Sequence, residues 1–233
     1  MEYCKKLDVA PAVSPHSKSP PPTRSVVVIS SVNMCSKETE NFDLAPRRAK
    51  CVVVGNESVG KTSILTGFTT GFMPPVHVPT IFDHYSVDVI VDDRKVRLEL
   101  TDTAGQESFT DLRRLSYYNT RVFIVCFSVV DRNSFLNVKS QWIPELRLYS
   151  SFSHVILVGT KIDLREPAED KGEDRVSRKE GRKMARKIGA LKYVECSSLR
   201  NIGLRSLFED ISRLVLYSEP SKIKESESCC NVL

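Results

Sequence analysis

The segment VVVGNESVGKT (Val52–Thr62) limits the possible folds of this chain more than any other stretch. An apolar, strand-like run, KCVVVG, ends at Gly55, and a helical run, GKTSILTGFTT, begins at Gly60. A Gly-x4-Gly-Lys-Thr pattern between a strand and a helix is typical of a phosphate-binding loop. Its glycines let backbone N–H groups point at phosphate oxygens, and the helix N-terminus adds partial positive charge. The segment therefore predicts an α/β domain that binds a phosphorylated ligand.

Strand-like and helix-like segments alternate from residue 50 onward. YSVDVIVDDRKVRLEL alternates apolar and polar residues around Asp92–Asp93, as expected of a hairpin. A helix is expected from Asp131, its cap, to Tyr149, with a kink at Pro144, and SRKE is a capping box. We predict a doubly wound, mostly parallel sheet with one antiparallel edge hairpin and helices on both faces. Further strands are expected in RVFIVCF, HVILVG and YVEC, and a closing helix in LRSLFEDISRLVLY.

We divide the 233 residues into three parts. Residues 1–48, rich in Pro and Ser, are predicted to be a flexible extension, with a polyproline ligand as the alternative for SPPPTR. Residues 49–217 form the predicted domain, and 218–233 a flexible tail. Ser25–Cys35 has no clear cleavage site, Glu2 excludes N-myristoylation, and no apolar run reaches the ~18 residues of a membrane span.

Charge and cysteine content exclude other classes of function. The net charge of +5 is modest and the basic residues are dispersed, so nucleic acid is not an expected partner. Seven cysteines, an odd number without metal-ligand spacing, argue against a disulfide framework. Cys51, Cys126 and Cys196 lie in strand-like apolar runs and are expected to be buried thiols, which indicates a reducing compartment.

Side chains near the loop suit a nucleoside triphosphate and a metal ion. Lys61 can neutralise the β- and γ-phosphates, and the Thr62 hydroxyl can bind Mg²⁺. Asp102 in LELTDTAGQE follows a strand and supplies a second magnesium-side oxygen. The amide of Gly105 can meet a γ-phosphate, and Gln106 can orient an attacking water. These groups predict phosphate release by in-line attack of water.

The sequence also predicts which base is bound. Lys161 and Asp163 of GTKID follow a buried strand, where α/β sheets bind ligands. A carboxylate at Asp163 can accept two hydrogen bonds from guanine, whereas adenine presents a lone pair there. Backbone amides of Ser198 and Leu199 in CSSL can reach the guanine carbonyl.

With these motifs assembled, the chain resembles the Ras superfamily and, within it, the Rho family, over about Ala49 to Tyr217. KCVVVG, VPTIFDHYSVDV, DTAGQESFTDLRRLSY, VFIVCFSVVDRNSFLNVKSQWIPEL and GTKIDLR are most similar to its Rac and cell-polarity branch. The resemblance implies the P-loop small GTPase fold and a GTP/GDP switch with Mg²⁺, whose loops around Thr80 and Gln106 rearrange when the γ-phosphate leaves. Thr80 would reach both metal and γ-phosphate, and Lys61, Thr80 and Gln106 would be catalytic.

The resemblance also implies partners: exchange factors, GTPase-activating proteins, and effectors such as kinases or cytoskeletal regulators. Asp83 and Tyr85 match positions at which Rac-type effectors add a strand. The Rho branch itself carries glutamate at the first of these, which favours Rac-like effectors and signalling to the actin cytoskeleton or cell polarity. The residues expected to contact nucleotide are Gly55, Ser58, Val59, Gly60, Lys61, Thr62, Ser63, Gly105, Thr160, Lys161, Asp163, Ser197, Ser198 and Leu199.

Glu57 is the departure from the family pattern with the largest expected effect, because the family has glycine there. Its carboxylate would lie near the γ-phosphate, in the space that Gln106 and an arginine finger must share. At ~5 Å and an effective dielectric of ~20, repulsion from phosphate is on the order of 3 kcal/mol, and loss of the finger could cost ~10³- to 10⁵-fold in rate. We expect reduced hydrolysis; the alternative is that Glu57 points into solvent and changes little.

Other departures affect exchange and partners. The family's aromatic beside guanine aligns on Met73, which would speed exchange, unless Phe72 fills the place. His77 replaces a tyrosine over the phosphates, and REPAEDKGEDRVSR indicates a shortened Rho insert. Thr101 stands where Rac has Trp and its nearest relatives have Phe, which leaves the choice of exchange factor open.

The C-terminal CCNVL matches a prenylation motif. Cys230 is the expected geranylgeranyl site, and Cys229 is a palmitoylation candidate because the tail lacks a basic stretch. We expect the cytoplasmic face of the plasma membrane or of endomembranes, with a cytosolic pool.

Three functions are compatible with these residues. The first is a prenylated Rho-type switch with weak self-inactivation, favoured by Gln106. The second is a constitutively GTP-bound scaffold without meaningful catalysis, favoured by Glu57. The third, an ATP-using phosphate-loop enzyme, would require Asp163 to be incidental.

Overall fold

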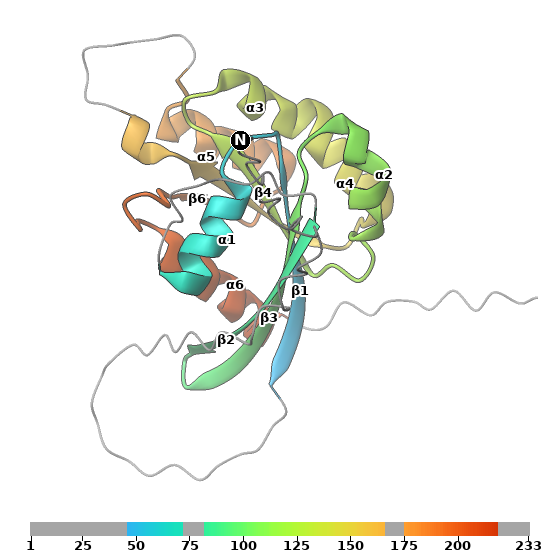
Figure 1. Cartoon of the computed structure of the whole chain (residues 1–233), viewed down its shortest axis with the longest axis vertical. Helices are drawn as coiled ribbons and strands as arrows, with labels where there is room; N and C mark the ends of the chain where they lie inside the picture. The colour runs from blue at the N-terminus through green and yellow to red at the C-terminus, as the bar shows by residue number, and fades with distance from the viewer. Residues whose placement is uncertain (1–45, 72–81, 166–174, 219–233) are drawn as a thin grey trace, which may run out of the picture.

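The computed structural model describes residues 46–71, 82–165 and 175–218. Within these residues, six strands form one sheet in the order β2-β3-β1-β4-β5-β6, and only the β2–β3 pair is antiparallel (Figure 1). The predicted doubly wound α/β fold, with its edge hairpin, is confirmed. The strands are β1 (Arg47–Gly55), β2 (Phe82–Val91), β3 (Arg94–Thr103), β4 (Val122–Ser128), β5 (His154–Thr160) and β6 (Lys192–Glu195). The helices are α1 (Lys61–Thr70), η1 (Glu107–Phe109), α2 (Thr110–Leu115), α3 (Arg132–Asn137), η2 (Val138–Trp142), α4 (Ile143–Tyr149), η3 (Ile162–Leu164), α5 (Arg178–Ile188) and α6 (Leu204–Tyr217).

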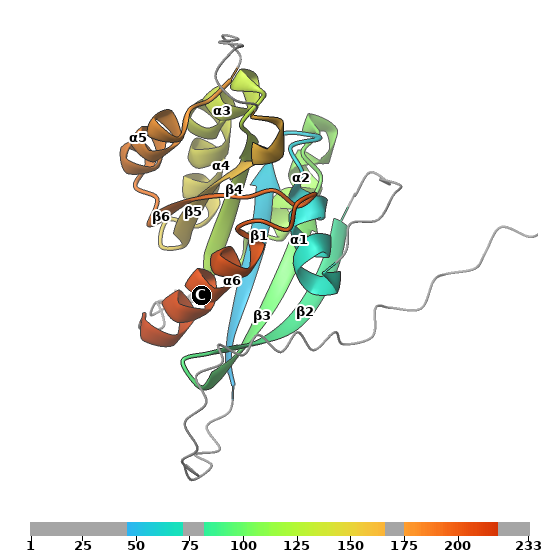
Figure 2. The same ribbon diagram turned by 90° about the vertical axis from the view of Figure 1, so that its left-hand side faces the viewer.

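The sheet is buried on both faces because successive side chains of its central strands point to opposite sides. In β1, Val53 joins the core under α1 and α6, whereas Val54 joins the core under α3, α4 and α5 (Figure 2). Phe68 of α1 and Phe208 of α6 stack with ring centroids 3.8 Å apart in the first core. Replacing Phe208 by alanine would leave a cavity there and cost about 3 to 5 kcal/mol.

Local sequence chemistry sets the hairpin turn. Asp92 and Asp93 have φ angles of 49° and 56°, the left-handed conformation that a two-residue turn between twisted strands requires. Asp tolerates this conformation better than most residues because its short polar side chain can bond locally. The hairpin predicted around these residues is therefore present.

The helical segment from Arg132 to Tyr149 contains the expected irregularity. Asp131 caps it by accepting a hydrogen bond from the Ser134 amide at 3.1 Å. A π-helical turn, η2, ends at Trp142, directly before α4, whose second residue is Pro144. Proline has no N–H and its ring crowds the preceding turn, so a widened turn accommodates it.

The capping box at α5 and the buried thiols are also present. Ser177 and Glu180 exchange hydrogen bonds across the first turn of α5. Cys51, Cys126 and Cys196 are free and buried, and burial raises the pKa of Cys51 to about 12. A membrane-spanning helix is absent from the part of the chain that the structure describes.

Candidate nucleotide-binding site

The predicted phosphate loop lies where several parallel strands end. The sheet register sets Val53 beside Asp102 and Gly55 beside Cys126, so the carboxyl ends of β1, β3 and β4 meet at one edge. Gly55 has φ 145°, and a Cβ there would lie 2.2 Å from the carbonyl oxygen of Cys126, so only glycine fits. Gly60 has φ 97° and begins α1 without a side-chain cap. The loop therefore directs unpaired helix N–H groups toward this edge.

Lys61 lies across this loop. Its side chain is 7% exposed, and its ammonium donates to the carbonyl oxygens of Gly55 at 2.9 Å and Asn56 at 2.7 Å. Burial lowers the pKa of Lys61, an effect opposed by the nearby Asp102 carboxylate. The loop carbonyls thus hold one cation at the position where phosphate charge is expected.

Thr62 and Asp102, the two residues predicted on the magnesium side, form a hydrogen-bonded pair. The Thr62 hydroxyl donates to Asp102 Oδ2 at 2.5 Å, and Asp102 is fully buried near the end of β3. Two adjacent oxygen donors fit Mg²⁺, which takes few protein ligands and completes its shell with water and phosphate. No group of three or more His, Cys, Asp or Glu suited to a metal occurs among residues 46–71, 82–165 and 175–218. Thr80, the expected third element, lies outside these residues.

The base-side residues come together at the ends of β5 and β6. The Thr160 hydroxyl lies 2.5 Å from the Val59 carbonyl oxygen, which ties the phosphate loop to β5. Lys161 adopts φ 59° and is the N-cap of η3, which carries Asp163. The buried Ser197 hydroxyl donates to Asp163 Oδ1 and accepts from a backbone amide at 3.0 Å. Asp163 is thereby oriented at this edge. Ser198 and Leu199 follow in a turn closed by a bridge from Ser197 to Ile202, and Ser63 lies in the first turn of α1.

Glu57 faces Gln106, the glutamine predicted to orient the attacking water. The Gln106 side-chain amide donates to Glu57 Oε1 at 2.8 Å across an exposed gap. Beneath this contact the backbones touch, because a Cβ on Gly105 would lie 2.4 Å from the Glu57 amide nitrogen. The loop after β3 is therefore packed on the phosphate loop, and a carboxylate holds the group expected to orient water.

Sequence reasoning missed the buried arginine that supports this loop. Arg113 of α2 is 1% exposed and donates to the carbonyl oxygens of Ala104 at 3.0 Å and Gln106 at 3.1 Å. Its guanidinium also pairs with both carboxylate oxygens of Glu145, each at 3.1 Å. Nothing in the local pattern distinguishes Arg113 from Arg114, whose side chain is 37% exposed.

An aromatic link joins the same arginine to the phosphate loop. Arg113 lies over the Trp142 ring, 4.8 Å from its centroid. The Trp142 indole N–H donates to Asn56 Oδ1 at 2.8 Å. The chain has a single tryptophan, and its position shortly before Pro144 was the sequence feature that could have indicated this buried network. The two loops of the site therefore share one buried network.

The predicted effector residues lie on an edge strand. Asp83 and Tyr85 are on β2, whose outer edge pairs with no strand of the described residues. Tyr85 is half-buried, and burial together with Asp83 raises its pKa. Across the hairpin, Thr101 is buried and its hydroxyl lies 3.0 Å from His84 Nδ1.

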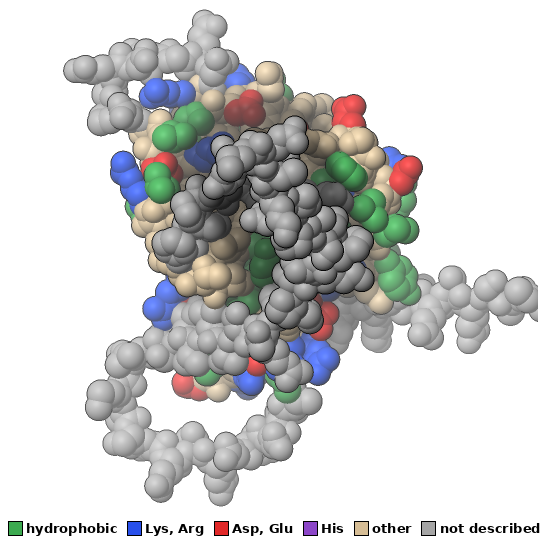
Figure 3. Space-filling model, viewed as in Figure 1, with side chains coloured by type: hydrophobic (Ala, Val, Ile, Leu, Met, Phe, Trp, Pro, Cys, Tyr) green, Lys and Arg blue, Asp and Glu red, His purple; other side chains and the backbone are tan. Residues whose placement is uncertain are grey.

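Hydrophobic side chains also gather where α2 and α4 lie (Figure 3). Leu115, Tyr118 and Leu148 there are 76%, 74% and 78% exposed. A cluster of exposed apolar side chains of this kind is a candidate contact for a partner protein. The predictions for Phe72, Met73, His77, the centre of the insert, Cys229 and Cys230 lie outside the described residues.

A glycine loop between β1 and α1, a buried lysine across it, and paired oxygen donors beside it define a phosphate-loop nucleotide-binding protein. The Ras family model matches residues 50–217, and the chain belongs to the Ras family of small GTPases. It is 42% identical over 195 residues to the Ras-like GTP-binding protein RhoL of Drosophila melanogaster, covering 84% of this chain and all of that protein. The chain is therefore a GTP-binding molecular switch that works with regulators and effectors.

Proposed function

We propose that this protein is a Rho-type switch, loaded with GTP or GDP and Mg²⁺, whose own hydrolysis is slowed by Glu57. The observation that carries the proposal is the hydrogen bond from Gln106 to Glu57 Oε1. Holding the Gln106 side-chain amide against a carboxylate competes with the orientation in which that side chain would position an attacking water. The switch therefore remains GTP-loaded for longer than it would with glycine at position 57.

The magnitude follows from this contact. A hydrogen bond to a charged group contributes about 1.5 to 3 kcal/mol when buried. Because this one is exposed, we take about 1 kcal/mol, which corresponds to about fivefold in rate. The Glu57 carboxylate also adds negative charge beside Lys61, where phosphate charge must be accommodated. The held Gln106 amide and the added negative charge are both expected to slow hydrolysis.

Single-turnover GTP hydrolysis tests this proposal. We expect Glu57→Gly to raise the intrinsic rate at least about fivefold and to permit a response to an activating protein. Glu57→Gln keeps a hydrogen-bond acceptor but removes the charge, so its hydrolysis rate should lie between the rates of the parent and of Glu57→Gly. Glu107→Gln is the matched control, because it removes a carboxylate next to Gln106 without touching the contact. If Glu57→Gly and the parent hydrolyse GTP at the same rate, the proposal is wrong.

A GTP-loaded binding scaffold is the second candidate, and the same Glu57 contact favours it. The two functions differ in the nucleotide that the purified protein carries. GDP after purification supports a slow but working hydrolase, whereas GTP supports the scaffold. Chromatography of the nucleotide released by heat distinguishes them.

We further propose Rac-like effectors and a prenylated C-terminus. Support for the effectors comes from β2, an edge strand that carries Asp83 and Tyr85, since an open edge can accept a partner strand. Signalling to the actin cytoskeleton or cell polarity would follow from such effectors. Support for the anchor is the Cys230-Asn-Val-Leu sequence with Cys229 beside it. With such an anchor, the proposed location of the switch is the cytoplasmic face of the plasma membrane or of endomembranes, with a cytosolic pool.

A further inference from the structure

Helix α5 carries a concentration of positive charge that the nucleotide site does not use. Six of its eleven residues are exposed Lys or Arg, and together they cover one half of the helix circumference. The opposite side, with Gly181, Met184, Ala185 and Ile188, is buried. The cationic residues are Arg178, Lys179, Arg182, Lys183, Arg186 and Lys187.

Most of this charge has no described counterion. The helix's single acid, Glu180, serves the capping box and pairs with Arg132 at 3.0 Å. Arg178 reaches Glu195 only at 3.9 Å, and Glu195 already pairs with Arg165 at 2.9 Å. For the other five cations of the helix, no carboxylate among the described residues lies within ion-pair distance. Lys187 instead has Lys139 as a neighbour, whose ammonium lowers the pKa of Lys187.

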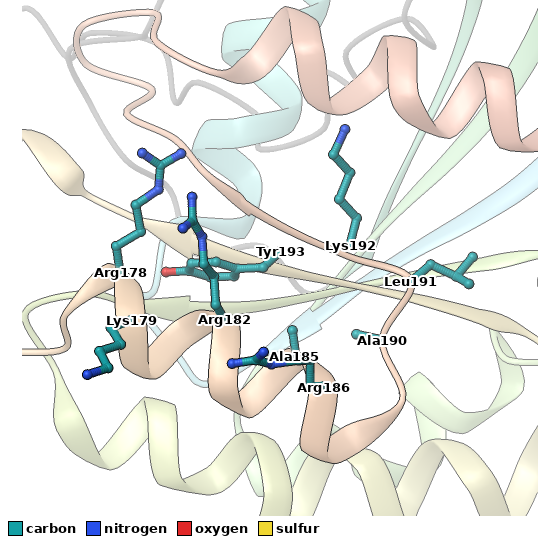
Figure 4. A pocket seen from close by; sticks show the side chains of 9 residues that line it. All are labelled: Arg178, Lys179, Arg182, Ala185, Arg186, Ala190, Leu191, Lys192 and Tyr193. Carbon is teal, nitrogen blue, oxygen red and sulfur yellow. The ribbon is translucent and has the colours of Figure 1, made fainter.

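The charge borders a concave site. A cavity of about 600 Å³ lies between α5 and β6, in the angle closed by the turn after α5. The side chains of Arg178, Arg182 and Lys192 extend in the same direction beside it, whereas Lys179 points away (Figure 4). Lys192 pairs with Asp210 of α6 at 2.5 Å on the far side. The groove therefore has the guanidinium groups of Arg178 and Arg182 along one side, with Arg186 lying along the helix beside them, and a single, paired ammonium on the other (Figure 4).

The floor of the groove is largely apolar. Ala185, Ala190, Leu191 and Tyr193 line it, and Leu191 is 55% exposed. The Tyr193 ring lies against the helix backbone, since a Cβ at Gly181 would be 2.2 Å from its Cζ. Such a floor is available for the apolar part of a bound chain, which favours a peptide over a fully hydrated small anion.

The spacing of the arginines selects an extended chain. Arg178, Arg182 and Arg186 are four residues apart, so they repeat every ~6 Å along the helix. Side chains on one face of an extended peptide repeat every ~6.7 Å. Carboxylates at alternate positions can therefore meet successive guanidinium groups, each in the two-pronged geometry that arginine favours.

We propose that the α5–β6 groove is a docking site for an extended, acidic segment of a partner protein that carries carboxylates at alternate positions. A flat anionic membrane fits less well, because the arginine row borders a concavity. The site lies apart from the nucleotide residues, so its occupant can be bound in both nucleotide states. This inference is independent of the effect assigned to Glu57.

The test measures fluorescence anisotropy of two labelled peptides on the full-length protein in GDP- and GTP-loaded forms. The first is an eight-residue peptide of alternating glutamate and serine, and the second has the same composition with its glutamates in one block. We expect the alternating peptide to bind at least about fivefold tighter. Arg182→Glu with Arg186→Glu should weaken it at least about tenfold. The matched control, Arg48→Glu with Arg94→Glu, makes the same change in net charge at exposed positions elsewhere and should bind like the parent.

Several results would overturn the proposal. Equal binding of the two peptides, or equal losses in the two charge-reversed variants, would mean that net charge alone attracts the peptide. Binding to phosphatidylserine vesicles through α5 without peptide binding would assign the surface to a membrane. A tenfold gain in peptide affinity in Glu225→Gln with Glu227→Gln would show that the chain's own C-terminal segment occupies the groove. GDP release and thermal unfolding of each variant verify that the domain is intact.

Discussion

Replacing Arg113 by alanine should destabilise this domain far more than a surface arginine would. The guanidinium is 1% exposed and makes hydrogen bonds to Glu145 and to the backbone carbonyls of Ala104 and Gln106. Its removal leaves the Glu145 carboxylate, which is 9% exposed, buried without its cation. Breaking a buried pair from one side costs about 3 to 5 kcal/mol.

Urea unfolding at fixed GDP and Mg²⁺ concentrations measures this cost. With a slope of about 2 kcal/mol per M, a loss of 3 to 4 kcal/mol lowers the unfolding midpoint by about 1.5 to 2 M. Nucleotide must be held constant because it stabilises the folded state by mass action. Arg114→Ala is the matched control, since its partner Asp111 is 99% exposed and such pairs contribute about 1 kcal/mol or less.

A double-mutant cycle then separates the ion pair from the packing. If Arg113 and Glu145 act together, Arg113→Ala, Glu145→Ala and the double variant should show a coupling energy of about 2 kcal/mol. The reasoning would be refuted if Arg113→Ala cost no more than Arg114→Ala, or if the two changes were additive. The first result would mean that Arg113 does not support the loop that carries Gln106, and the second that Arg113 and Glu145 do not act as a pair.

Three further predictions concern single side chains. Hydrogen bonds from Arg97 lower the pKa of Asp88 from 3.8 to about 2. Because the pKa is lower in the folded state, the ionised carboxylate stabilises the folded protein above pH 4, and this stabilisation is lost as the pH falls toward 2. Asp88→Asn should therefore lower the free energy of unfolding at pH 7 by about 1 to 2 kcal/mol and flatten its dependence on pH in urea titrations. Asp163→Asn should weaken GTP at least about 100-fold, measured by calorimetry, with little change in unfolding; unchanged affinity would remove the assigned base contact. Cys230→Ser should move the protein from the membrane to the soluble fraction in cells, whereas Cys229→Ser should do so only in part, because one lipid chain gives reversible attachment.

Much of the site could be predicted because the loop chemistry is local. Gly55, Gly60, Lys61 and Thr62 are adjacent in sequence, and the strand and helix on either side have clear periodic patterns. The hairpin turn and the caps at Asp131 and Ser177 depend on residues within a turn of each other. Such features are set by steric limits and by hydrogen bonds between nearby residues, so they can be predicted without knowing the tertiary contacts.

The buried network and the basic groove depended on the tertiary structure. Arg113 and Arg114 are chemically equivalent neighbours, and only their directions relative to α4 make one buried and the other exposed. The contact between Glu57 and Gln106 joins residues 49 positions apart.

The sequence by itself determined the succession of the main strands and helices and the phosphate loop, and it identified Thr62 and Asp102 as candidate magnesium-side oxygens. Only the packed structure decided which arginine supports the loop that carries Gln106, that the Gln106 amide donates to Glu57, and that the charge of α5 borders a groove. The physical reason is that propensity and periodicity act over a few residues. Burial and ion pairing depend instead on which distant surfaces the completed sheet brings together.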